Sequence, residues 1–118
     1  DYGHIMENVI YNELRMRGMS VDVGMVEVNC KEDGKSKRKQ FEVDFVCNRG
    51  SQRYYIQSAY ALYDEEKRQK EIKSLRHIND SFRKILVQKE PVLPYYDDNG
   101  FLNLSLLDFL TDETVIDK

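Results

Sequence analysis

The chain has 118 residues, of which 41% are hydrophobic and 33% are charged, and its formal net charge is −3. This length fits one domain that buries a core without disulfides, and the composition excludes a disordered chain. The acidic balance argues against a chain that is basic throughout, as many nucleic-acid-binding proteins are. No apolar run approaches the ~20 residues of a membrane span and no signal peptide is present, so we expect a cytoplasmic protein without a membrane partner.

The first thirty residues predict a helix and then a strand. Apolar residues recur at helical spacing over residues 3–17, and Gly18 is a typical residue to end such a helix. Residues 21–30 predict a strand whose apolar phase shifts near Gly24. Either a bulge lies there, or both faces of the strand are covered.

The middle of the chain predicts a hairpin. Residues 31–39 are polar and predict a loop, whereas residues 40–47 and 53–60 predict two strands joined by a turn at residues 48–51. Four basic residues gather in the first of these loops, namely Lys35, Lys37, Arg38 and Lys39. They form either a solvated hairpin tip or a salt-sensitive contact with the phosphates of a nucleic acid.

The second half predicts a helix, a strand and a closing strand–helix pair. Residues 64–78 carry acids in the first turn and bases in the last, which suits the helix dipole. Residues 82–88 predict a buried strand, and residues 101–104 a short one. Ser105 is placed to cap a short helix over residues 106–110. The order helix, three strands, helix, strand, short strand and helix predicts an α/β (α+β) fold with a mixed sheet flanked by helices.

Asp44 is the most specific candidate for a site. Strand alternation places it on the face opposite the apolar residues of its strand, which are Phe41, Val43, Phe45 and Cys47. A hairpin loop over residues 49–52 sets a register in which Asp44 lies opposite Gln57. The alternative is an edge-strand aspartate that faces solvent.

Glu7 is a second candidate, because it borders the apolar face of the first helix. With Asp44 and Gln57 it would form a cluster of three oxygen-bearing side chains. Hard cations need several oxygen ligands at once, so such a cluster would suit Mg²⁺. The alternative for Glu7 is a rim position with an ion pair to a nearby lysine or arginine.

Three segments together resemble a known family. Residues 3–18, Glu42–Val46 and Ile56–Tyr60 are similar to the uncharacterised C-terminal domain of the AAA-type ATP-binding proteins of bacteria and archaea. The resemblance implies one PD-(D/E)XK, restriction-endonuclease-like domain over residues 1–118. It also implies an N-terminal ATPase domain as partner, and the start at Asp1 rather than Met suggests a piece of that longer chain. No GxxxxGK[ST] phosphate loop occurs here, so any ATP site would lie outside this chain.

The resemblance assigns roles to four positions. Glu7 matches the acid of the first helix, and Asp44 matches the metal-binding acid. Gln57 stands where the family has its second acid, and Ala59 stands where it has a lysine. A lysine there would help to activate water, and such acid–base help contributes ~10²–10⁴-fold to a rate.

We therefore expect a catalytically degenerate, nuclease-fold accessory or binding module of an AAA-type ATP-binding protein. It would hold no cofactor of its own, with Mg²⁺ only if activity survives. One alternative is a divergent Mg²⁺-dependent DNA endonuclease, in which Glu7 and Asp44 hold the metal and Lys39 replaces the missing lysine. Another is a docking or dimerisation domain for the ATPase. The partner would be the ATPase domain itself, DNA or another protein.

Overall fold

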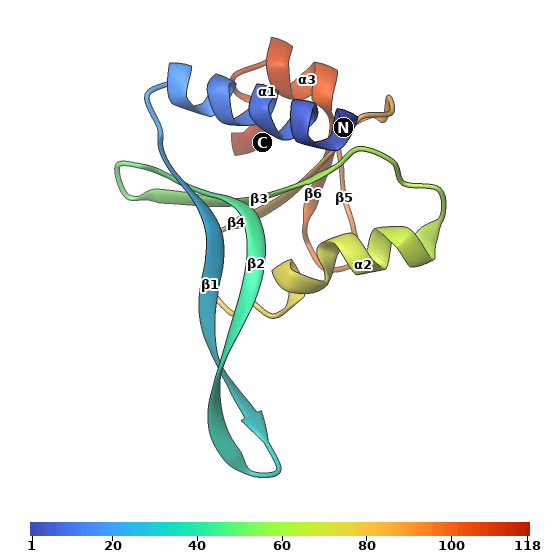
Figure 1. Ribbon diagram of the computed structural model, residues 1–118. Coiled ribbons are helices and arrows are strands. Elements are labelled where there is room, and N and C mark those ends of the chain that lie inside the picture. The colour runs from blue at the N-terminus through green and yellow to red at the C-terminus, as the bar shows by residue number, and fades with distance from the viewer.

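The computed structural model describes all 118 residues and contains one six-stranded mixed sheet with helices on both faces (Figure 1). The elements agree with the expected order along the chain, with a two-residue strand and a 3₁₀ turn in addition. They are α1 (Tyr2–Met16), β1 (Ser20–Glu32), β2 (Lys35–Arg49), β3 (Gln52–Ala59), α2 (Glu65–Arg76), β4 (Arg83–Gln88), β5 (Tyr95–Tyr96), β6 (Leu102–Ser105), α3 (Leu106–Thr111) and η1 (Val115–Asp117).

The strands lie in the order β1-β2-β3-β4-β6-β5. The first three form an antiparallel meander, whereas β4 is parallel to both β3 and β6. A parallel pair needs a crossover, and α2 supplies it between β3 and β4. The expected mixed α+β sheet is therefore confirmed.

Local capping explains where the helices begin. Ser105 caps α3 as expected, since its Oγ accepts from the N–H of Asp108 at 3.1 Å. Asp64 caps α2 by accepting from the N–H of Lys67 at 2.8 Å. Each side chain satisfies a backbone donor that has no partner inside the helix.

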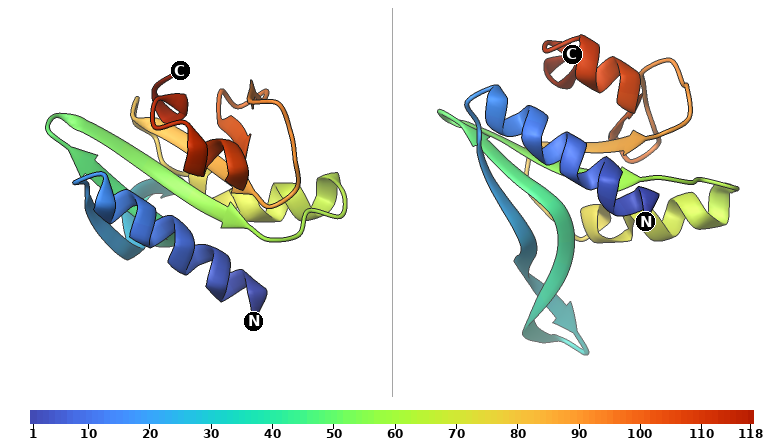
Figure 2. Two further views of the ribbon diagram at one scale, coloured as in Figure 1. Left: turned by 90° about the horizontal axis from the view of Figure 1, so that it is seen from above. Right: turned by 45° about the horizontal axis from the view of Figure 1, so that its top comes forward.

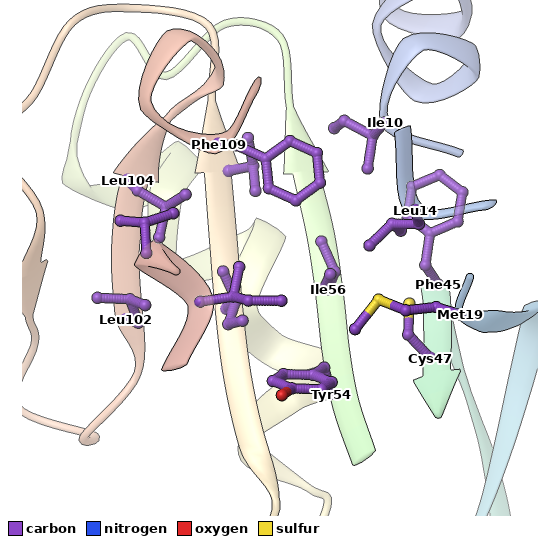
Figure 3. Close-up of a cluster of buried hydrophobic side chains, with 14 of the residues drawn as sticks. Ile10, Leu14, Met19, Phe45, Cys47, Tyr54, Ile56, Leu102, Leu104 and Phe109 are labelled. Carbon is purple, nitrogen blue, oxygen red and sulfur yellow. The ribbon is translucent and has the colours of Figure 1, made fainter. Parts of the chain in front are cut away.

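Helices lie over both faces of the sheet (Figure 2), and an apolar layer packs on each face. The larger one lies under α1 and α3, where Ile10, Leu14 and Phe109 face strand residues such as Ile56 (Figure 3). The smaller one lies under α2 and comprises Val43, Tyr55, Ala59, Ile72, Leu75, Ile78, Leu86 and Phe101. Because α2 contributes few residues to this layer, most of its surface faces water, as its sequence predicted.

The prediction of a loop over residues 31–39 is wrong. The two strands continue through it and meet at a two-residue turn, Asp33–Gly34, forming a long arm that stands away from the body (Figure 1). Both turn residues have positive φ, 51° and 75°, and Asp-Gly is a strong hairpin signal for that geometry. The polar composition of residues 31–39 hid this hairpin signal in the sequence. We call residues 25–42 the arm, because β2 pairs with β3 only from Phe45 onward.

The expected single apolar face of β2 is also wrong. Val43 packs in the layer under α2, whereas Phe45 and Cys47 pack in the layer under α1. The pairing explains the switch: Gly24 lies opposite Val43 and Asp22 opposite Val46, so β2 has one residue more than β1 between these pairs. Of the two alternatives proposed for the phase shift near Gly24, the bulge is therefore present. Its extra residue lies in the partner strand β2, at Asp44–Phe45.

No helix of the structure is long and apolar enough to cross a membrane.

Candidate functional site

Asp44 lies on the bulge of β2, and two hydrogen bonds tie it to β3. Its backbone N–H donates to Oε1 of Gln57 at 3.0 Å, and its Oδ2 accepts from the N–H of Ser58 at 2.8 Å. The β2–β3 register begins at Phe45–Ile56, as the predicted alignment requires, and the bulge leaves the N–H of Asp44 outside the ladder. The Gln57 amide therefore supplies the acceptor that a backbone carbonyl would normally provide.

Glu7 and Asp44 lie together at the surface. Both line a hollow of about 310 Å³ with Tyr11 and Val23, and both line a second hollow of about 230 Å³. The second one, which we call the acidic hollow, is lined by Asp1, Gly3, His4, Glu7, Asp44, Ser58, Tyr60 and Glu71. α1, β2 and α2 thus bring four carboxylates into one small space.

Burial raises the pKa of Asp44 to about 7. The N–H of Ser58 acts in the opposite direction because it stabilises the carboxylate, while the nearby charges of Glu7 and Glu71 raise the pKa further. A protonated Asp44 can share its proton with the carboxylate of Glu7, and this hydrogen bond also raises the pKa. With a pKa of about 7, the carboxyl of Asp44 is partly protonated at neutral pH.

His4 lies beside two of the acids of the hollow. Its Nδ1 lies 3.1 Å from Oε2 of Glu7, and its Nε2 lies 3.6 Å from Oδ2 of Asp1. Lys67 similarly lies 3.1 Å from Glu71. Each outer acid therefore has a basic neighbour, whereas no cationic side chain forms an ion pair with Asp44.

The residues present do not fit a Mg²⁺ site. No group of three or more Asp, Glu, His or Cys side chains is arranged to hold a metal ion. The amide oxygen of Gln57 accepts from a backbone N–H, and Gln57 does not line either hollow. Ala59 is only 3% exposed and packs in the α2 layer with Ile72 and Leu75, so apolar contacts surround the position at which the resemblance implies a lysine.

The structure therefore brings Glu7 and Asp44 together and places Gln57 against the backbone of Asp44, but it does not gather all three around one point. Sequence reasoning missed His4 and Glu71. Glu71 precedes the buried Ile72 on α2, as Glu7 follows the buried Met6 on α1. An acid next to a buried apolar residue of a helix was therefore the signal in the sequence that could have identified Glu71.

The four basic candidates lie on the arm, and acids of the same arm oppose most of them. Lys37 and Lys39 both form ion pairs with Glu32, and Arg38 lies 3.9 Å from Glu27. Lys35 forms no ion pair. Their contact with nucleic acid stays a prediction, weakened by this neutralisation.

Lys39 does not replace the missing lysine. It is five residues from Asp44 along β2, roughly 16 Å at strand spacing, and it is paired with Glu32 on the arm.

A larger hollow, of about 410 Å³, lies at the other end of the central strands, near the start of β4. It contains neither Glu7 nor Asp44, and size alone does not identify chemistry. We take the acidic hollow as the candidate for a remnant active site, because only there does a carboxyl group have a strongly raised pKa.

These observations define a small mixed α+β domain in which Glu7 and Asp44 line one surface hollow at a bulge of the sheet. The model of the family described as "Domain of unknown function (DUF4143)" matches residues 2–107, and the chain belongs to this family. It is also similar to an uncharacterized protein of Haemophilus influenzae, with 33% identity over 87 residues that cover 74% of the chain. The matched region is 18% of the length of that relative.

Proposed function

We propose that this chain is a nuclease-fold accessory module of an AAA-type ATP-binding protein, with a degenerate catalytic site, and that it acts by binding a partner rather than by cutting nucleic acid. The order of elements and the mixed sheet support a restriction-endonuclease-like core. The short span matched in the relative supports a module that belongs to a longer protein.

One observation carries the proposal: the groups at the remnant site satisfy each other without a cation. The carboxyl of Asp44 accepts from Ser58, its N–H donates to Gln57, and its raised pKa leaves it partly uncharged beside Glu7 at neutral pH. In a working site a metal ion would separate such acids and draw oxygen ligands inward. Here the amide of Gln57 braces the bulge instead.

The missing lysine supports the same conclusion. Nuclease chemistry needs a group that orients or deprotonates the attacking water. The methyl of Ala59 cannot do this, and it lies in the apolar layer rather than in the hollow. The two departures, at positions 57 and 59, are therefore built into the packing.

The cutting function is tested with circular and linear DNA, single-stranded DNA and RNA, each with Mg²⁺ or Mn²⁺. We expect no cleavage above that of Asp44→Ala. Metal-dependent cleavage by the wild-type protein that is lost in Asp44→Ala would overturn the proposal.

The binding function is tested by mixing this domain with the ATPase region of the same protein on a size-exclusion column. Co-elution and a changed ATPase rate are the expected results. A domain that elutes alone and leaves the rate unchanged contradicts docking. If the domain alone elutes as a dimer, its self-association would be the relevant contact.

A divergent Mg²⁺-dependent DNA endonuclease is the second candidate, favoured by the placement of Asp44 on a bulge beside Glu7. Bulges are frequent next to active sites because they re-aim a side chain. Calorimetry with Mn²⁺ tests it, because a metal-binding wild type and a non-binding Asp44→Asn variant would support it. Absence of heat in both would remove it.

A further inference from the structure

A second, larger hollow is far from the acidic hollow along β3 and β4. It has a volume of about 410 Å³ and lies between the end of α2, the start of β4 and the loop before β6. We call it the basic hollow, because three of its lining side chains are Arg76, Arg83 and Lys84 and only one, Asp80, is acidic.

Asp80 neutralises Lys84 but not the arginines. The Nζ of Lys84 donates to Oδ1 of Asp80 at 2.9 Å and to the carbonyls of Asp80 and Phe82 at 2.8 and 2.9 Å. All three ammonium donors are thereby used. The Lys84–Asp80 pair is therefore a closed structural unit with no net charge to offer a ligand.

Arg83 is held in place by a hydroxyl and two main-chain oxygens. Its guanidinium donates to the hydroxyl of Tyr96 at 3.3 Å and to the main-chain oxygens of Asp117 and Lys118 at 3.0 and 2.6 Å. The side-chain carboxylate of Asp117 is directed to Arg49 and Tyr54 instead. Arg83 is thus a fixed guanidinium group that forms no ion pair with an Asp or Glu side chain.

Arg76 is a free cation at the same hollow. It is exposed at the last position of α2, and it forms no ion pair and no side-chain hydrogen bond. The last carbonyls of α2 carry roughly half a negative charge, which offsets only part of one guanidinium. Arg76 and Arg83 therefore bring two guanidinium groups to the hollow, neither of them paired with an Asp or Glu side chain, in a chain whose net charge is −3.

Aromatic faces border these charges. Phe82 is 39% exposed and Tyr96 is 54% exposed, and both line the hollow. The guanidinium of Arg53 lies 5.8 Å from the ring centre of Phe82, and its Nε donates to the neutral side chain of Asn48. A third arginine, which forms no ion pair, thus lies beside the rim of the hollow.

We propose that the basic hollow binds the phosphate of a nucleotide unit, with its planar base against Phe82 or Tyr96. Arginine forks suit phosphate oxygens, and aromatic rings stack on any base. The volume lies within the range of small-molecule sites. The unit is either a free mononucleotide or part of a single strand, and the proposal is independent of the degenerate nuclease site.

The test is a titration of the protein with four probes at low salt: AMP, adenosine, inorganic phosphate and a short single-stranded oligonucleotide. We expect AMP, the oligonucleotide or both to bind, and adenosine to bind at least tenfold more weakly than the probe that does. Binding of AMP but not of the oligonucleotide identifies a free nucleotide, and the reverse identifies a strand. Both outcomes support the proposal, and binding of neither AMP nor the oligonucleotide at millimolar concentration overturns it.

Arg76→Gln is the decisive variant, because Arg76 has no structural partner whose loss would unfold the protein. We expect its affinity for the binding probe to fall about tenfold, as the loss of a charge-assisted contact implies. Lys70→Gln is the matched control: it removes one charge from an exposed position of the same helix outside the hollow, and we expect less than a twofold change. Equal losses in both variants would reduce the binding to general charge attraction and overturn the proposal.

Discussion

The backbone N–H of Asp44 donates to the side chain of Gln57 across the β2–β3 pair at 3.0 Å, and this bond braces the bulge from which Asp44 projects. Gln57, at the position where the resemblance implies a second acid, thus holds the backbone of its cross-strand neighbour Asp44. The stability of the bulge and the state of Asp44 are therefore open to separate tests.

Gln57→Leu should destabilise the domain by about 1–3 kcal/mol, because the part-buried N–H of Asp44 loses its acceptor. Chemical denaturation measures the change. Gln69→Leu is the control, since Gln69 is part of α2 and bonds only to Glu65 on the surface, and we expect a change within about 0.5 kcal/mol. Equal effects in the two variants would show that Gln57 does not brace the bulge.

Asp44→Asn should gain stability relative to the wild type as the pH rises. The folded-state pKa of Asp44 is about 7, because burial, with the nearby charges of Glu7 and Glu71, raises it from 3.8. The folded protein therefore holds the proton more tightly than the unfolded chain, and wild-type stability falls as the pH rises from about 4 to about 7. Between pH 5 and pH 8 we expect a relative gain of about 1–2 kcal/mol for Asp44→Asn, allowing for partial solvent screening.

Asp112→Asn is the control for this pH dependence. Hydrogen bonds from Thr114 and Lys118 lower the pKa of Asp112 to about 2, so its stabilising contribution is present above pH 4 and is lost only below that. The variant should therefore be weakened equally at pH 5 and pH 8. Urea melts at both values distinguish the two cases, and a flat profile for Asp44→Asn would contradict the raised pKa.

Ala59→Lys should destabilise the domain by about 2–4 kcal/mol rather than restore a nuclease, because it forces an ammonium into the apolar layer under α2. Thermal melts give the measurement. Ala61→Lys, two residues beyond the end of β3, is the control, with an expected cost below about 1 kcal/mol. A stable Ala59→Lys protein that gains Mg²⁺-dependent cleavage would show that the lysine position still opens to the site.

Lys84→Met should cost about 3–5 kcal/mol, since Lys84 is only 8% exposed and its loss leaves the carboxylate of Asp80 without its cation. Burial acts to raise the pKa of Asp80, but hydrogen bonds from Tyr55, Lys84 and Phe82 hold it below its usual value. Lys73→Met, at an exposed position of α2, should stay within about 0.5 kcal/mol. Denaturant midpoints of the two variants give the comparison. A small effect of Lys84→Met would mean that water solvates the carboxylate of Asp80 once the lysine is removed.

Spacing within single elements was enough to predict α1, the cap at Ser105, the β2–β3 register and the helix between two parallel strands. It was also enough to single out Asp44 and Glu7, because a carboxylate beside an apolar stripe is visible in the residue order. The Asp33–Gly34 turn was equally local and was overlooked only because its neighbours are charged.

The sequence by itself determined which residues alternate, cap and turn, because these properties depend on neighbours a few positions away. Only the tertiary structure decided that Val43 and Phe45 face opposite layers, since the bulge arises from pairing with a strand some twenty residues distant. It likewise brought Glu71 from α2 to Asp44, paired Glu32 with basic side chains of the same arm, and placed Arg76 and Arg83 beside one hollow. The balance of charges depends on the distances between them in space, and these distances cannot be read from spacing along a single strand or helix.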